Sequence, residues 1–396
     1  MAVSVGLVAQ VLEKIAPKSW AEDWDNVGLL VGEASASVER VLIALDGTVN
    51  VIEEAREIGA QLIITHHPLM FRPLKNLRND NLSAQVPIRA LKYGISYYAS
   101  HTNLDQSRLS ASWSIGEALK LRKLELLAET AHEELVKLVV FVPEPQVEDV
   151  RLALVRVGVG DGVTEGPGSD LYSECFFQSV GEGMFRPLQG ANPAIGELGE
   201  LTKVNEVKLE GILPKQLVSR AIKALRQAHP YEEPAYDLIP LHNNGKSRGY
   251  GVIGYLDKPE KLREFWPRVL SSLTDLVPSE LLQSKAESGL FGGVRVAGDL
   301  DKEIRKVAIA NGSGGSFASK AVFKGADLFI TGDIDYHAVL DSLEAGMAIA
   351  DLGHYWSELP MLKNIANCLA GEKQLQGIDI CISKANSVPW VEVGKI

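Results

Sequence analysis

Residues 61–68 read Gln-Leu-Ile-Ile-Thr-His-His-Pro, an apolar run that ends in two adjacent histidines and a proline. The apolar run is typical of a buried strand in an α/β protein. Pro68 biases His67 toward extended backbone, so the histidine pair leaves the strand as an open loop. Open α/β sheets build their sites at the carboxyl ends of strands, and imidazole is the commonest protein ligand for transition metals. We therefore predict that His66 and His67 bind a metal at the rim of a parallel sheet, with a solvated loop as the alternative.

The bulk composition is that of a globular protein of two or three domains. The chain has 396 residues, of which 46% are hydrophobic and 23% are charged. Lys and Arg number 40 against 51 Asp and Glu, and the resulting charge of −11 disfavours a nucleic-acid partner. No stretch approaches the roughly 18 consecutive apolar residues of a membrane span, and residues 1–15 read as a folded helix rather than a signal peptide. Three scattered cysteines without a CxxC pair favour the reducing cytoplasm.

Segments with strand and helix patterns alternate at both ends of the chain. Near the amino terminus, the patterns predict strands over residues 41–45, 61–64 and 95–100, separated by helices over residues 51–58 and 86–91. Near the carboxyl terminus, they predict strands over residues 306–310, 328–330, 347–351 and 378–382, and helices over residues 317–324, 337–344 and 359–369. Strands separated by helices of this size predict parallel sheets covered by helices on both faces.

The middle of the chain has a different order of elements. The patterns predict strands over residues 137–143, 171–180, 204–211 and 235–241, helices over residues 146–157 and 215–229, and a polar turn-rich exit over residues 241–247. The resulting β-α-β-β-α-β order is that of a ferredoxin-like unit. We therefore expect a discontinuous, two-lobed α/β body, residues 1–133 and 246–396, with a ferredoxin-like domain inserted over residues 134–245.

Ligand-type side chains also follow other predicted strands. Residues 101–105 and 354–358 each begin with a histidine and end with a carboxylate four positions later, and Asp46 and Asp333 end two further strands. In a helix, positions i and i+4 lie on one face, so both groups of such a pair can reach one ion or adjacent ions. Imidazoles with carboxylates suit zinc, manganese, iron or cobalt. Five or more ligands exceed one closed tetrahedral site and would fit two ions that together lower the pKa of bound water.

These motifs together resemble one known family. The pieces Asp-Asn-Val-Gly-Leu at residues 25–29, Thr-His-His-Pro at 65–68, His-Thr-Asn-Leu-Asp at 101–105, Thr-Gly-Asp at 331–333 and Gly-His-Tyr-Trp-Ser-Glu at 353–358 resemble the Nif-three-like family, often labelled GTP cyclohydrolase I type 2 homologue. The resemblance covers residues 1–130 and 248–396. The insert, with Ala-His-Pro-Tyr-Glu-Glu-Pro at 228–234, resembles that of the longer YqfO-type members rather than the short YbgI type; its fold is similar to the PII and CutA trimeric proteins.

The resemblance implies a dinuclear centre with two divalent metal ions per subunit. Carried over position by position, the metal ligands are His66, His67, Asp105, His354 and Glu358. His101 and His337 would lie close by as supporting or proton-transfer groups. Family members form toroidal hexamers whose sites face an internal cavity, and the activity attached to the label is opening of the GTP imidazole ring. We therefore expect a cytoplasmic metal-dependent hydrolase of a small nucleotide-like substrate; the alternative is a ring-shaped metal-binding or regulatory protein without turnover.

Four of these residues have more than one interpretation. His101 is a ligand, a hydrogen-bonding support or a packing residue, and His337 lies either at the site or on a helix surface. Asp46 either orients a ligand or caps a helix, and Asp25 either faces the site or belongs to a turn.

Two further motifs are weaker. The loop at residues 311–316, between a predicted strand and a helix, could hold phosphate on its backbone amides or serve tight packing, and it lacks the Walker lysine. His229 lies in a segment bounded by prolines, which favours a rigid turn or a subunit contact over metal ligation.

Overall fold

The structure, a computed structural model, describes residues 3–162, 171–285 and 294–385. Its contacts divide the chain into two compact units: the body, made of Met1–Glu129 and Gly249–Ile396, and the insert, Thr130–Arg248. The sequence analysis placed these divisions after residues 133 and 245. No helix in the described ranges is both long and apolar enough to span a membrane.

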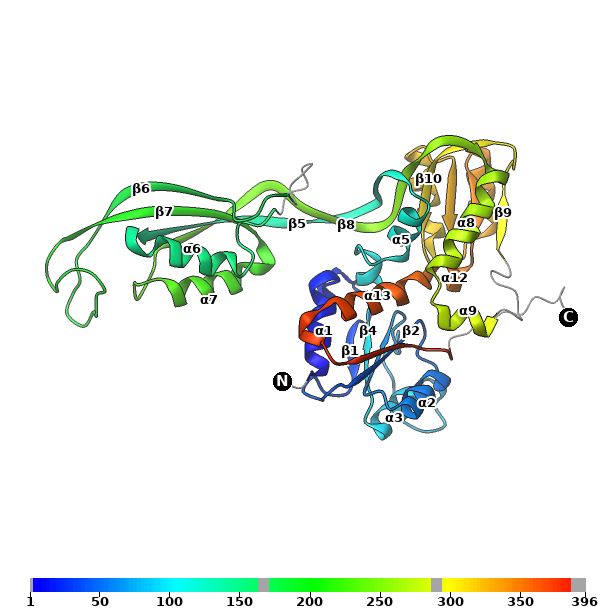
Figure 1. The fold of residues 1–396 in the computed structure, drawn as a ribbon, viewed down its shortest axis with the longest axis horizontal. Coiled ribbons are helices and arrows are strands. Elements are labelled where there is room, and N and C mark those ends of the chain that lie inside the picture. Colours follow the sequence, from blue (N-terminus) through cyan, green and yellow to red (C-terminus); the bar gives the residue numbers. More distant parts are fainter. Residues whose placement is uncertain (1–2, 163–170, 286–293, 386–396) are drawn as a thin grey trace. The chain divides into compact units, whose positions relative to one another are not determined.

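The first sheet of the body has five strands, and Figure 1 shows its helices. In spatial order the strands are β1 (Gly28–Val31), β4 (Ser96–Ala99), β3 (Leu62–Thr65), β2 (Arg40–Ala44) and β13 (Asp379–Ile382). All neighbours are parallel except β1, which is antiparallel to β4. The associated helices are α1 (Val5–Ile15), α2 (Val49–Ile58) and α3 (Gln85–Tyr93).

Alternation along these strands explains why both faces of the sheet are covered. Val41 and Ile43 belong to the same apolar cluster as α1, whereas Leu42 and Ala44 belong to the cluster that contains α2 and α3. Successive side chains of a strand point to opposite faces, so a continuous apolar run buries both. The predicted parallel sheet with helices on both faces is confirmed in this lobe.

The second sheet of the body repeats this plan. Its core strands, β10 (Glu303–Ala310), β11 (Leu328–Thr331) and β12 (Ala348–Asp351), are parallel, and antiparallel strands flank them: the end of β8 (Tyr236–Lys261) beside β10, and β9 (Arg295–Ala297) beside β12. The apolar cluster on one face includes residues of α5 (Ala111–Ala118), α8 (Leu262–Leu276), α9 (Ser279–Lys285) and α13 (Pro360–Gly371), and that on the other face includes residues of α10 (Ala318–Phe323) and α11 (Tyr336–Glu344).

The carboxyl-terminal strand is not part of the second sheet. β13 pairs in parallel with β2, so the chain returns to the first lobe after completing the second. A single apolar cluster also includes residues of α1 from the first lobe and of α8 and α13 from the second. The two lobes therefore share one core. The sequence analysis assigned residues 246–396 to the second lobe, but β13, which lies within that range, belongs to the sheet of the first lobe.

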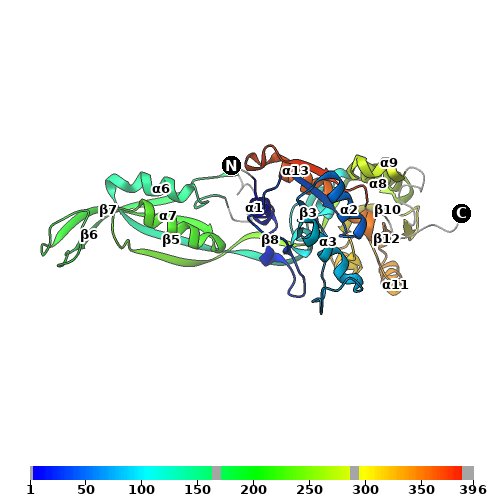
Figure 2. The same cartoon turned by 90° about the horizontal axis from the view of Figure 1, so that it is seen from below.

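The insert has the ferredoxin-like topology predicted from the sequence. Its elements are β5 (Arg122–Pro143), α6 (Val147–Val155), β6 (Phe176–Phe185), β7 (Thr202–Pro214), α7 (Val218–Ala228) and β8, with strand order β6–β7–β5–β8. Both views show α6 and α7 on the same face of these strands (Figure 1, Figure 2). The apolar residues of this face, including Val140, Val150 and Leu225, form the insert's own core.

Three segments of the insert differ from expectation. The predicted strand over 171–180 begins at Phe176, β5 begins at Arg122 instead of residue 137, and residues 241–247 continue β8 instead of forming a turn. Many side chains along these extensions are polar and exposed, so these segments lack the hydrophobic pattern from which strands were predicted. Neighbouring strands pair through backbone hydrogen bonds, which polar side chains do not prevent. Two strands can therefore stay paired along a segment whose sequence predicts a loop.

Candidate metal centre

Loops at the carboxyl ends of the parallel strands bring four histidines together. His66 and His67 follow β3, His101 follows β4, and His354 follows β12 and begins the short helix α12 (His354–Glu358). Ring centroids lie 4.9 Å apart for the tandem pair, 5.0 Å for His66 and His101, and 5.2 Å for His67 and His354. The Thr65 hydroxyl donates to the His67 carbonyl at 2.8 Å and fixes the turn of the chain there.

All four imidazoles are oriented in the same way. In each ring Nδ1 faces an oxygen acceptor: the Ser100 carbonyl at 3.0 Å for His66, Asp46 at 2.8 Å for His67, Asp25 at 3.0 Å for His101 and Asp333 at 2.9 Å for His354. Donation from Nδ1 leaves the Nε2 lone pair of a neutral ring available. Metal-binding histidines are characteristically held by such an acceptor on the second nitrogen.

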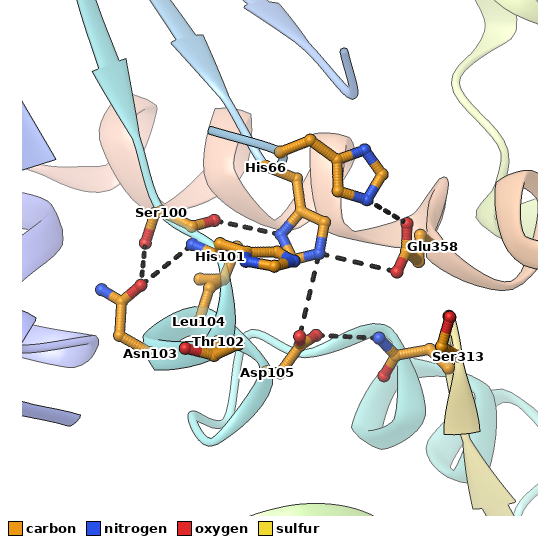
Figure 3. Close-up of polar contacts among 12 residues, drawn as sticks. His66, Ser100, His101, Thr102, Asn103, Leu104, Asp105, Ser313 and Glu358 are labelled. Carbon is orange, nitrogen blue, oxygen red and sulfur yellow. Dashed lines mark hydrogen bonds and ion pairs between the residues drawn. The ribbon is translucent and has the colours of Figure 1, made fainter. Parts of the chain in front are cut away.

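Two carboxylates complete the cluster (Figure 3). The buried Glu358 lies with Oε1 3.2 Å from Nε2 of His354 and Oε2 3.1 Å from Nε2 of His67. His354 and Glu358 are the i and i+4 residues of α12, as the spacing predicted. Asp105, at the end of α4 (Thr102–Asp105), has Oδ2 3.8 Å from Nε2 of His66.

The donor set fits a divalent cation. His66 is fully buried, and its Nε2 has no hydrogen-bond partner among the described residues. This nitrogen lies 3.6 Å from Glu358 and 3.8 Å from Asp105, beyond hydrogen-bonding distance of either carboxylate. A buried polar atom without a partner is costly unless something binds it. Ligand atoms of His66, His67 and His101 lie within 4.8 Å of one another, as do those of His67, His354 and Glu358.

The carboxylates strongly perturb the titration of the histidines. Burial lowers the pKa of His67, but hydrogen bonds with Asp46 and Glu358 outweigh it and raise that pKa to about 10. Burial also acts to lower the pKa of His354. The hydrogen bond and the charge of Glu358 outweigh burial and raise this pKa to about 9. Although burial acts to raise it, the pKa of Glu358 lies well below its usual value because three histidines surround the carboxylate. Charged imidazoles thus face a charged carboxylate, and a cation bound among them would take the place of the imidazole protons.

Asp25 supports the site and is not merely part of a turn. Besides His101, its carboxylate accepts hydrogen bonds from the backbone amide and the hydroxyl of Thr102, at 3.0 and 2.5 Å. These contacts outweigh burial and lower the pKa of Asp25 to about 2. The carboxylate thus stays charged and fixes both His101 and the start of α4, which carries Asp105.

The loop at residues 311–316 contributes through packing. Asn311 accepts a hydrogen bond from the Ser112 hydroxyl at 2.6 Å, and this fixes its amide so that Nδ2 donates to Asp105 at 2.8 Å. The next residue, Gly312, has φ of +60°, and a Cβ there would lie only 2.1 Å from Oε1 of Glu358. Only glycine leaves room for the carboxylate at this point of the loop.

The cluster borders a cavity of about 780 Å³. His67, His101 and His354 line it together with Asp105 and Glu358. Its remaining wall includes four aromatic residues that the sequence analysis did not single out: Trp24, Phe71, Tyr250 and Phe317. Such a volume accommodates a ligand of the size of a nucleotide or a small drug.

Comparison with known proteins supports the family resemblance of the sequence motifs. The family model described as Duf34/NIF3 (NGG1p interacting factor 3) matches residues 3–389. The chain belongs to the Duf34/NIF3 family. Of its Duf34/NIF3 relatives, the GTP cyclohydrolase 1 type 2 homolog of Halalkalibacterium halodurans is 42% identical over 88% of this chain and 87% of its own length. The protein of the same name in Bacillus subtilis is 36% identical over 97% of both chains.

A solved structure extends this similarity to three dimensions. The Bacillus cereus protein related to NIF3 superimposes with a TM-score of 0.84 at 37% sequence identity, over 99% of this Duf34/NIF3 chain and 100% of that one. The family resemblance and the fold class predicted from the sequence are both confirmed.

Two histidines named in the sequence analysis do not join the cluster. His337 is the second residue of α11, where it is exposed and contacts the ring of Tyr336; it is not among the residues that line the cavity of this Duf34/NIF3 chain. His229, in the insert, uses Nε2 to donate to the Phe141 carbonyl at 3.0 Å and Nδ1 to accept from the Tyr231 amide at 3.1 Å. Both of its nitrogens are engaged, which favours the structural interpretation.

Proposed function

We propose that this Duf34/NIF3 protein binds two divalent metal ions and uses them to hydrolyse a small nucleotide-like substrate in the cytoplasm. The proposed ligands are His66, His67, Asp105, His354 and Glu358, and the proposed ions are zinc, manganese, iron or cobalt. The observation that carries the proposal is the common orientation of the four imidazoles, each with Nδ1 on an acceptor. In His66, His67 and His354 the other nitrogen, Nε2, lies near Asp105 or Glu358. Such a concentration of oriented nitrogen and oxygen ligands is difficult to explain by packing alone.

The chemistry follows from the residues around the centre. When bound, divalent ions polarise an electrophilic group and lower the pKa of water, which favours hydrolysis. His101 is the proposed proton-transfer group because Asp25 holds its Nδ1 while the ring borders the cavity. The curated relatives bear the name GTP cyclohydrolase 1 type 2 homolog, which is the basis for a nucleotide-like substrate.

A double substitution tests metal binding directly. Changing His66→Ala together with His67→Ala removes both nitrogens of the tandem pair, and we expect the purified protein to contain no stoichiometric metal by elemental analysis. Circular dichroism should show retained secondary structure, because neither histidine belongs to an apolar core cluster. His242→Ala, at an exposed position of the insert, is the matched control and should retain full metal content. Unchanged metal content in the double variant would refute the ligand assignment.

Turnover is tested separately on the metal-loaded protein. GTP and simple phosphate esters are offered to the wild-type protein and to the double variant. Hydrolysis that disappears in the double variant supports an enzyme. Tight metal binding without hydrolysis of any of these substrates would instead favour the ring-shaped regulatory protein.

The proposal includes the assembly that the family resemblance implies. A toroidal homohexamer of 43.0 kDa chains has a mass of 6 × 43.0 = 258 kDa. Sedimentation equilibrium of the full-length protein at micromolar concentration should give this mass. A monomer or dimer under those conditions would contradict it.

A further inference from the structure

Two large aromatic side chains are exposed at the wall of the cavity. Trp24 exposes 61% of its surface and Phe71 exposes 52%, and both line the cavity. Each meets the His101 ring edge-on, with ring centroids 6.0 Å away for Trp24 and 5.5 Å away for Phe71. Apolar surface beside a cluster of polar groups in a concave site is characteristic of a ligand-binding pocket.

The chain next to both aromatic residues is anchored by hydrogen bonds. Trp24 immediately precedes Asp25, whose carboxylate is anchored to His101 and Thr102. Asn26 donates from Nδ2 to the carbonyl of Met70 at 2.8 Å, directly before Phe71. This hydrogen bond joins the segment that carries Trp24 to the loop that carries Phe71. The backbone that carries the pair is therefore fixed, which reduces the entropy lost when a ligand binds.

The other two aromatic residues of the wall already have partners. Tyr250 stacks on Phe317 with centroids 5.4 Å apart and an interplanar angle of 28°, and its hydroxyl donates to Glu22 at 2.7 Å. The rings of Tyr250 and Phe317 thus already contact each other, and the Tyr250 hydroxyl already has a hydrogen-bond partner. The exposed faces available to a flat ligand belong to Trp24 and Phe71.

The charge of the wall limits what the ligand can carry. The acidic lining residues are Glu22, Asp46, Asp105 and Glu358. Among the described residues that line the cavity, none is Lys or Arg. Two divalent ions would neutralise these four carboxylates and leave no excess positive charge for a polyphosphate, which is recognised elsewhere by Lys, Arg and backbone amides.

We propose that the cavity binds a compound of the nucleoside class, a planar heteroaromatic ring without a polyphosphate chain, with the ring against Trp24 and Phe71. This inference rests on the proposed function for the role of the metal, but the stacking of the ring does not depend on turnover. The ring would lie beside His101 and place its attached groups next to the histidine cluster. Nucleosides are therefore expected to bind more tightly than the corresponding triphosphates.

Binding of defined probes to the full-length, metal-loaded protein tests the inference. Adenosine, guanosine and GTP are titrated by calorimetry into the wild-type protein and into Trp24→Ala, Phe71→Ala and Trp24→Phe variants. Loss of one stacking face should weaken nucleoside binding by about 5- to 150-fold, whereas Trp24→Phe, which keeps an aromatic ring, should retain most of the affinity. Phe323→Ala is the matched control, because Phe323 is 84% exposed on α10 and does not line the cavity.

The outcomes separate this inference from the proposed function. The inference is supported if both nucleosides bind more tightly than GTP and the two alanine variants lose that binding while keeping wild-type metal content. It is overturned if GTP binds more tightly than guanosine, if neither nucleoside binds, or if Phe323→Ala weakens binding as much as Phe71→Ala. Metal content by elemental analysis and hydrolysis of phosphate esters report on the proposed function independently of these titrations.

Discussion

Replacing Gly312 with alanine should weaken metal binding without a comparable effect on folding. Gly312 has φ of +60°, and the added methyl would lie 2.1 Å from Oε1 of Glu358, where ordinary contact begins at 3.4 Å. The carboxylate must therefore retreat by roughly 1.3 Å. Its Oε1 lies 3.2 Å from Nε2 of His354, so this movement disturbs the proposed ligand geometry.

The expected magnitudes follow from two separate effects. Left-handed backbone costs an alanine about 1 kcal/mol relative to glycine, and this lowers the free energy of unfolding. Disturbing a group that orients or supplies a ligand lowers metal affinity by about 10- to 100-fold, or roughly 1.4 to 2.8 kcal/mol. Only the second effect depends on the contact with Glu358.

Gly325→Ala separates these effects. Gly325 has φ of +72°, but a Cβ there would meet nothing within 4 Å. Urea unfolding of the metal-free proteins should show a similar loss of stability in both variants, whereas titration with Zn²⁺ or Mn²⁺ should show weakened binding in Gly312→Ala alone. If Gly312→Ala binds the ion as tightly as Gly325→Ala does, the assignment of Glu358 as a ligand next to this loop is wrong.

Three further perturbations have definite expected results. Asp333→Asn should lower metal affinity by about 10- to 100-fold in calorimetry, because the carboxylate that holds Nδ1 of His354 becomes a neutral amide; affinity equal to the wild type would contradict that supporting role. Because the folded pKa of Asp25 is about 2, against 3.8 ordinarily, its charge stabilises the fold above pH 4 by at most about 2 kcal/mol, and this contribution is lost as pH falls from about 4 to 2. The stability difference between the wild type and Asp25→Asn in urea unfolding should shrink over that range; a constant difference would refute the shift. His229→Ala should destabilise the insert by about 1–3 kcal/mol and leave metal content unchanged, because it removes two hydrogen bonds of the insert and no proposed ligand.

The sequence was most informative where strands are buried and parallel. The runs around residues 41–45, 61–64, 328–330 and 347–351 predicted β2, β3, β11 and β12 within one or two residues, because burial on both faces requires continuous apolar side chains. The expectation that polar residues at the ends of these strands would meet was also correct in geometry. His66, His67, Asp105, His354 and Glu358 lie together although they come from both ends of the chain. That they bind metal remains a prediction.

Features that depend on tertiary context were missed. β1 is a short antiparallel edge strand whose start reads as an Asp-Asn turn, and α8 contains Pro267, which normally argues against a helix interior. The partner of His66 is a backbone carbonyl, and side-chain types say nothing of which carbonyl faces a site. The exposure of Trp24 and Phe71 was likewise invisible, because an aromatic residue in a sequence is equally consistent with a buried core position.

The place of β13 beside β2 has a consequence for how the protein is made. Synthesis proceeds from the amino terminus, and early segments of a chain begin to fold while later ones are still being added. Here the edge of β2 stays without its neighbour until residues 379–382 have left the ribosome. The loop after β2 carries Asp46, the residue that orients His67, so the strand that leads to this corner of the centre gains its second neighbour only after β13 has been synthesised. A chain cut short before β13 would leave an open strand edge, a surface prone to aggregation, next to an unfinished site.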